Sequence, residues 1–329
     1  MKKFGFTKNV EKLVDPINVG SIHFLQQFLT MLPTTYQNKI IEKNADKTPH
    51  MGFVVEPYSS FLCYVVEDVE KANSLLPDNF EMVKSNVITD EEPEYYALFG
   101  SFNVHTSAFW GQRMEFYLVA RDKTTGLLTW IIVDYDTNTI SYDKKGGLIS
   151  PTTERSIITT DFDGNVIVDI KRANAHNELV YDCNITKGVM TKMADELWLY
   201  GNLSIGYGKE LSHNSPDVFS LKFDPKEVEQ ALKIPKNNYT IDVNNWYSDM
   251  LNTEPKHVLV FPYAQHMLSD SPGTSSLLKD VETMLAAKDA INFEKMNVYN
   301  PKETTNLMKK SSLALFFIII GLIIALILK

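Results

Sequence analysis

The sequence of 329 residues has little cysteine and no excess of positive charge, and each shortage narrows the classes of protein to consider. The two cysteines, Cys63 and Cys183, fit reduced thiols better than a disulfide framework. Lys and Arg number 32 against 41 Asp and Glu, so the formal net charge of −9 argues against nucleic acid as a partner. The seven histidines lack metal-ligand spacing, and no phosphate loop, serine-hydrolase or zinc-protease motif is present. We therefore expect neither a metal nor a cofactor.

An apolar run dominates the C-terminal end of the chain. Leu313 to Leu328 is sixteen residues long without a charge, with Lys309 and Lys310 before it and Lys329 after it. A helix of that length spans ~24 Å, short of a hydrocarbon core of ~30 Å, but flanking lysines extend its reach by snorkelling. The alternatives are a buried core helix and an interfacial helix, yet the run offers no polar face for the interface. Residues 311–329 are therefore predicted to form a single-pass transmembrane anchor.

The N-terminus bears on the orientation of that anchor. Met1-Lys2-Lys3 is followed by a charged stretch without the apolar segment of a secretory signal. The main domain is therefore expected to stay in the cytosol, with the chain tail-anchored and its paired lysines at the cytosolic face.

The rest of the chain divides by pattern into three parts. Residues 1–49 read as an N-terminal helical extension, 50–295 as one β-rich domain, and 296–310 as a tether to the anchor. The body is predicted to be mainly β within an α+β class: an antiparallel β-barrel or curved sheet with peripheral helices. The segments expected as strands are 58–66, 94–105, 113–121, 127–134, 156–162, 165–172, 178–186 and 219–223.

Local signals predict the connections between these segments. Asp163-Gly164 lies between two apolar runs and predicts a hairpin with a type I′ turn. Residues 224–235 and 275–293 have apolar side chains at helical spacing and predict helices.

Residues 58–172 resemble the acetoacetate decarboxylase family. The similar segments are VVEDVEKANSLLPDNFEMV (65–83), FNVHTSAFWGQRMEF (102–116) and TISYDKKGGLISPTTERSIITTDFDGNVIVDIKR (139–172), in the family's order and spacing. The resemblance implies a lyase that decarboxylates a β-keto acid through a lysine Schiff base, whose amine is kept neutral by a neighbouring cation. By position, Lys144 would be that lysine, Lys145 its cationic neighbour and Glu115 one active-site carboxylate.

The same resemblance marks departures. The family's second carboxylate falls near Gly100 and its substrate-binding arginine near Tyr58, while Asp143 precedes the lysine pair and would raise a neighbouring amine's pKa. Arg113 and His105 are the candidate replacements, for binding the substrate carboxylate and for proton transfer.

Ordinary interpretations of the same residues stay open. The lysine pair also fits a solvated turn between two strands, Glu115 a charge at a sheet rim, and His105 a half-buried histidine. Two hypotheses follow: a membrane-anchored decarboxylase acting on a small keto acid, or a non-catalytic barrel of the same fold that binds an apolar ligand or a partner protein. The sequence leaves homo-oligomer formation open.

Overall fold

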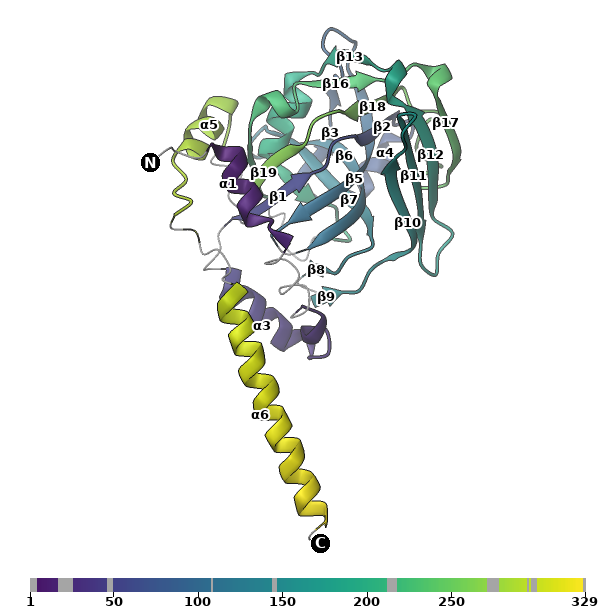
Figure 1. Ribbon diagram of the computed structural model, residues 1–329. Coiled ribbons are helices and arrows are strands. Elements are labelled where there is room, and N and C mark those ends of the chain that lie inside the picture. The colour runs from purple at the N-terminus through teal and green to yellow at the C-terminus, as the bar shows by residue number, and fades with distance from the viewer. Residues whose placement is uncertain are drawn as a thin grey trace.

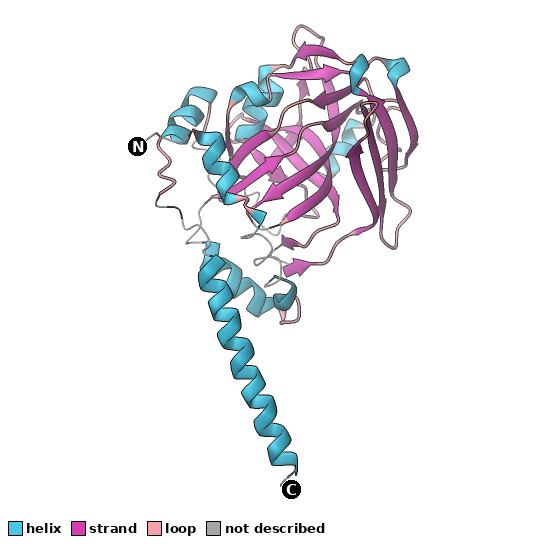
Figure 2. Ribbon diagram, viewed as in Figure 1, coloured by secondary structure: helices cyan, strands magenta, loops and turns pink. Residues whose placement is uncertain are grey.

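The computed structural model describes residues 5–16, 26–45, 50–107, 109–143, 147–211, 218–270, 278–294, 296 and 301–327. Strands make up most of the body, and helices lie mainly at its periphery (Figure 2). The helices are α1 (Phe6–Leu13), α3 (Thr34–Ala45), α4 (Val69–Ser74), α5 (Val281–Asp289) and α6 (Pro301–Ile327), with short 3-10 and π turns such as η2 (Glu196–Tyr200). The predicted α+β class is confirmed.

A large curved sheet of 13 described strands forms the centre of the body (Figure 1). Its main path runs through β13 (Val189–Lys192), β16 (Gln230–Lys233), β18 (His257–Phe261), β2 (Ser59–Val65), β5 (Glu94–Thr106), β1 (Met51–Val55), β19 (Gln265–Ser269) and β15 (Leu221–Phe223). Off this path lie β3 (Phe80–Met82), β4 (Lys84–Ser85), β6 (Trp110–Asp122), β7 (Leu128–Thr137) and β14 (Ile205–Tyr207).

The described strands do not close into a barrel, so the barrel alternative in the sequence prediction is wrong and the curved sheet is confirmed. Strand β14 and the residues just before β15 share only the isolated bridge between Ile205 and Phe219.

Strand β5 divides the sheet into two wings. Its residues from Tyr96 to Ser101 pair with β2, and those from Val104 to Thr106 pair with β1 on the same edge. Between β1 and β2 the chain turns a corner at Tyr58. This residue has a φ of 71°, a value that residues other than glycine rarely adopt. Strand β1 pairs with β19 on its other edge, and β2 pairs with β18. The two wings of the sheet therefore separate at this corner.

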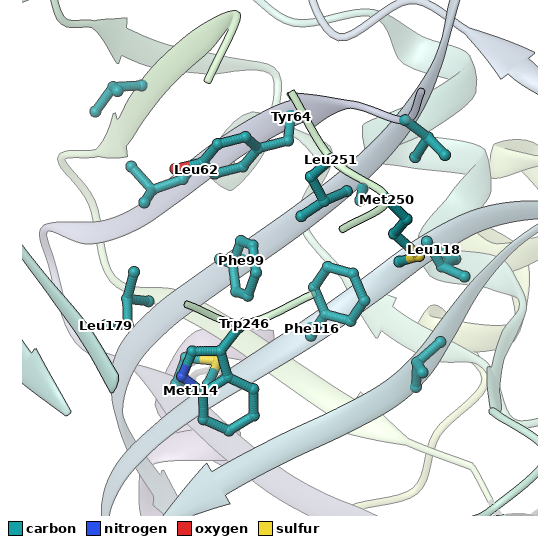
Figure 3. Close-up of a cluster of buried hydrophobic side chains, with 14 of the residues drawn as sticks. Leu62, Tyr64, Phe99, Met114, Phe116, Leu118, Leu179, Trp246, Met250 and Leu251 are labelled. Atoms are coloured by element: carbon teal, nitrogen blue, oxygen red, sulfur yellow. The ribbon is translucent and has the colours of Figure 1, made fainter. Parts of the chain in front are cut away.

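A second sheet covers one face of the large one. It contains β10 (Thr153–Thr160), β11 (Asn165–Arg172), β12 (Glu178–Asn184) and β17 (Tyr239–Asn244). Strict alternation along β11 and β12 buries every second side chain, and these pack on β2, β5 and β6. Figure 3 shows part of this core, where the rings of Phe99 and Phe116 lie 4.7 Å apart beside Trp246. Burial of such a side chain contributes about 1.5–3 kcal/mol.

Two local predictions differ from the structure in detail. The hairpin around Gly164 is present, but its loop holds four residues and only Gly164 has positive φ, so the turn is not type I′. Residues 224–235 are not a helix: a 3-10 turn, η4 (Pro225–Glu227), leads into β16. Pairing of β16 with both β13 and β18 outweighs the helical spacing, because a strand between two others satisfies its backbone on both sides.

Helix α6 extends away from the sheets (Figure 1). Its stretch Lys309–Ile327 has 19 residues with a mean hydropathy of 2.5, and none of it is buried. By length and composition it can cross a membrane. A short hairpin of β8 (Ser141–Asp143) and β9 (Gly147–Ile149) lies toward the same end of the body, and α3 packs on β9.

Candidate functional site

Arg113 and Glu115 lie next to each other on one face of β6. They alternate with Met114 and Phe116, which point into the core under the second sheet. The Arg113 Nε donates to one carboxylate oxygen of Glu115, and the Tyr117 hydroxyl donates to the other. Glu115 is only 8% exposed, so the structure places it in the interior rather than at a sheet rim.

Two tyrosines complete this buried cluster. The guanidinium of Arg113 lies 4.1 Å from the ring centre of Tyr135, the residue opposite Glu115 on β7. Burial alone would lower the pKa of Arg113, but the charge and hydrogen bond of Glu115, together with Tyr207 and Tyr135, outweigh it and the pKa is raised. Burial, together with Glu115, raises the pKa of Tyr117 well above its ordinary value, and burial raises that of Tyr207 to about 12. The cluster therefore pairs a charged arginine with phenols that keep their protons.

An aromatic ring fills the position where the resemblance places a second carboxylate. Gly100 lies opposite Glu115 on β5, and a Cβ built there would lie 2.7 Å from a ring carbon of Phe61. Phe61 is buried and makes edge-to-face contacts with Trp130, Trp198 and Phe261. A carboxylate at position 100 would have to displace that packing.

His105 lies on the opposite face of the sheet from Arg113 and Glu115. In the register of β5 with β6 it pairs with Trp110, and the two rings stack 3.8 Å apart. Its Nε2 lies 2.7 Å from the Glu56 carboxylate. The structure thus brings two of the predicted site residues together and separates the third from them by the thickness of the sheet.

Lys144 and Lys145 lie outside the described residues. The residues on either side of them are described: Asp143 and Gly147 pair as the ends of β8 and β9. This hairpin lies at the end of the body toward α3 and α6, whereas Glu115 lies in the middle of β6 (Figure 1).

Sequence reasoning missed a pocket at the corner between β1 and β2. It has a volume of about 280 Å³ and is bounded by the corner, by Asn103 of β5 and by the end of β10. Ser59 is 2% exposed and has no hydrogen-bond partner for its hydroxyl among the described residues, but alternation along β2 directs that hydroxyl to the face of Phe61, away from the second sheet. The lining residues are Glu56, Pro57, Tyr58, Ser59, Asn103, Ile158, Thr159, Thr160 and Val166. The Glu-Pro step of this corner was the available signal, because the residue before a proline favours an extended or turn conformation.

The edge of β10 is held over the large sheet beside this pocket. The Ile158 carbonyl accepts hydrogen bonds from the side-chain amides of Asn103, at 3.2 Å, and Gln112, at 3.1 Å. Glu56, on the opposite wall, is fixed by His105. Contacts between the two sheets, and between Glu56 and His105, therefore hold the walls of the pocket in place.

Metal ligation finds no support in this region. Among the described residues, no three His, Cys, Asp or Glu side chains gather closely enough to hold a metal ion.

The fold and these clusters define an α+β protein with curved antiparallel sheets, a buried arginine–glutamate pair and a corner pocket. The chain is similar to an acetoacetate decarboxylase structure from Legionella pneumophila subsp. pneumophila str. Philadelphia 1, with 9% identity and a TM-score of 0.45 over 67% of this chain and 85% of that one. A second structure, from structural studies of acetoacetate decarboxylase, has 11% identity and a TM-score of 0.36 over 67% and 86%. No family model and no curated protein matches the chain. Because identities and TM-scores are low, we take neither activity nor substrate from this likeness.

Proposed function

We propose that this chain is a membrane-anchored binding protein that holds a small ligand with hydrogen-bond donors in the corner pocket. The observation that carries the proposal is an open volume of about 280 Å³ whose lining combines the charged residue Glu56 with the apolar residues Ile158 and Val166. Ligand sites pair apolar surface with a few polar groups that fix the ligand's orientation. The volume lies near the lower end for ligand sites and fits a small molecule.

The lining sets the chemistry of the ligand. Glu56 is the one charged side chain among the described lining residues, and Pro57, Ile158 and Val166 supply apolar surface. A keto acid would bring its carboxylate toward Glu56 without an arginine or lysine of the described lining to receive it. An amine or alcohol with a short apolar part complements both features.

The buried cluster on the other face supports binding over catalysis. Both oxygens of Glu115 already accept hydrogen bonds, from Arg113 and from Tyr117. Phe61 fills the space beside Gly100. A carboxylate so engaged would have to break its buried ion pair before it could move a proton.

The anchor part of the proposal assigns α6 to the membrane. A helix of 19 residues spans ~28 Å, close to the ~30 Å hydrocarbon core, and the apolar side chains of α6 are exposed on all sides. Lys309 and Lys310 are exposed at the start of the apolar stretch of α6, which favours a cytosolic location for the body.

Binding to full-length protein in nanodiscs tests the pocket. Ligand-detected NMR with short amines and alcohols should show binding, and carboxylic acids of the same carbon skeletons should bind more weakly. Glu56→Gln removes the charge of the lining and should weaken binding of the amines about tenfold or more, the value of a hydrogen bond to a charged group. Glu81→Gln is the matched control, since Glu81 is exposed and lies outside the pocket lining. Equal binding by the acids, or equal loss in both variants, would contradict the proposal.

A lyase acting through Lys144 is the second proposal. It is supported by the resemblance of residues 139–172 and by the burial of Arg113 with Glu115, since buried ionised groups cluster at functional sites. In the reaction the lysine amine would attack the ketone with loss of water, the iminium would release CO₂, and the enamine would be protonated; water would then hydrolyse the resulting iminium, which releases the ketone product and the lysine amine.

Borohydride trapping separates the two proposals. With a β-keto acid, a lyase should give one adduct on Lys144 that is absent from Lys144→Ala, and Lys145→Ala should shift trapping to higher pH. Adducts scattered over surface lysines, or none between pH 5 and 9, would leave the binding protein as the account.

A further inference from the structure

The described N-terminal residues before β1 expose large apolar side chains next to a buried attachment point. Met31 is 78% exposed and Tyr36 60%, with Phe28 at 65% and Leu32 at 41%. These four residues are called the apolar patch below. They lie within a short helical stretch, the turn that follows it and the first turn of α3. So many exposed apolar side chains within nine residues of chain are more than the scattered apolar residues of an ordinary surface.

The patch is held to the body rather than left to move freely. Gln37 is 4% exposed, and its side-chain amide donates to the carbonyl of Leu32 at 2.7 Å. Its oxygen accepts the backbone N–H of Leu148 on β9, also at 2.7 Å. One buried glutamine thus joins the turn that carries the patch to the β8–β9 hairpin.

The position of α6 indicates what covers the patch. In Figure 1, α3 lies level with the first turns of α6, and the rest of α6 continues away from the body. If α6 spans a bilayer, the start of its apolar stretch at Lys309 and Lys310 marks the depth of the headgroups. Helix α3, whose first turn carries Tyr36 of the apolar patch, lies on the body's side of that stretch, level with the first turns of α6 (Figure 1).

We infer that the apolar patch is a second membrane contact, which inserts at the headgroup level and fixes how the body sits on the bilayer. Aromatic side chains and lysines together are typical of this layer. Tyr36 has the Lys39 ammonium 6.0 Å from its ring centre, so an aromatic and a cation lie side by side in the patch region. With a net charge of −9, the whole chain gains nothing from anionic lipids, and an apolar contact suits a neutral bilayer.

Fluorescent labels on full-length protein in phosphatidylcholine vesicles test this inference, which rests on the anchor of the proposed function. Cys63 and Cys183 are buried with 0% exposure, so single cysteines introduced on the surface can be labelled selectively. The variants are Met31→Cys and Tyr36→Cys in the patch, Leu322→Cys in α6, and Phe162→Cys as the control on a 97% exposed side chain.

Nitroxide lipids of two depths give the readout. Labels at positions 31 and 36 should lose emission with nitroxides near the headgroup, the label at 322 with deep nitroxides, and the label at 162 only with aqueous iodide. If deep nitroxides quench the label at position 322 while only iodide quenches the labels at positions 31 and 36, the inference is overturned and the anchor stands. If 322 also responds only to iodide, the anchor itself fails. Energy transfer between labels at 31 on two copies, without lipid quenching, would assign the patch to self-association and overturn the inference.

Discussion

The two faces of the large sheet differ in how completely the space around their polar side chains is filled. On one face Glu115 has both oxygens occupied by Arg113 and Tyr117, and the neighbouring space is filled by Phe61. On the other face, at the corner, Glu56 and Asn103 border an open pocket of about 280 Å³. The first arrangement is closed and serves packing, whereas the second leaves polar residues beside unfilled space. In this chain an ionised pair packed in the interior is therefore weaker evidence for a binding site than polar residues beside an open volume.

The largest effect expected on the closed face comes from removing Arg113. Arg113→Met leaves the Glu115 charge buried without its partner, which should lower the free energy of unfolding by about 3–5 kcal/mol. Arg155→Met is the control, because the Arg155 side chain is 39% exposed where it pairs with Asp169 and Glu178, so its loss should cost about 1 kcal/mol or less. Urea titration of the detergent-solubilised protein measures both. Equal costs would mean that the cluster is more hydrated than its burial indicates.

A smaller loss is expected when a methyl group is added to the closed face. Gly100→Ala places a Cβ against Phe61 and should destabilise the protein by about 1–3 kcal/mol. In the background of Phe61→Leu the same change should cost less, because the ring that it meets is gone. A double-mutant cycle by thermal unfolding measures this coupling, and the absence of coupling would refute the filled space beside Glu115.

The contact between helix α1 and the body at His266 is expected to weaken as the pH rises. Both ring nitrogens of His266 face carboxylates at 2.9 Å, those of Glu11 on α1 and of Glu227, and only the charged imidazole can donate to both. Burial alone would lower the pKa of His266, but these hydrogen bonds outweigh it and the pKa is raised above its ordinary 6.5. The charged form therefore stabilises the docking of α1 fully below that ordinary value, and the contribution is lost as pH rises through the folded-state pKa.

Protection of α1 is the measurement for this prediction. Proteolysis at Lys8 or Lys12 of α1 should become faster toward alkaline pH, after correction for the protease's own pH profile. In His266→Gln the rate should no longer depend on pH in that way. Unchanged pH dependence in the variant would place the sensitive group elsewhere.

The smallest effect on stability is expected at the corner pocket. Glu56→Gln changes a side chain that is 40% exposed where it contacts His105, so the free energy of unfolding without ligand should fall by about 1 kcal/mol or less in the same urea titration. The same variant should bind amines less well, so binding is lost with little loss of stability. A loss as large as that of Arg113→Met would mean that the corner is as closed as the other face.

Much of the fold could be predicted because its signals are local. The apolar run predicts α6 from composition, and the alternation on either side of Asp163 predicts the β10–β11 hairpin, where Gly164 has φ of 82°. The placement of Arg113 and Glu115 on one face follows from their spacing of two on a strand. The helix predicted at 224–235 failed because the pairing of β16 with two distant strands is not encoded in its own spacing.

By itself the sequence determined which residues share a face of a strand, where the chain turns, and that the C-terminal helix is apolar on every side. Only the tertiary structure decided that His105 and Glu115 lie on different faces of the sheet, since that depends on the register of β5 with β6. It also decided that Phe61 fills the space at Gly100 and that Ser59 borders a pocket. Periodicity is a property of neighbours along the chain, whereas register, filling and voids arise between segments that meet only after folding.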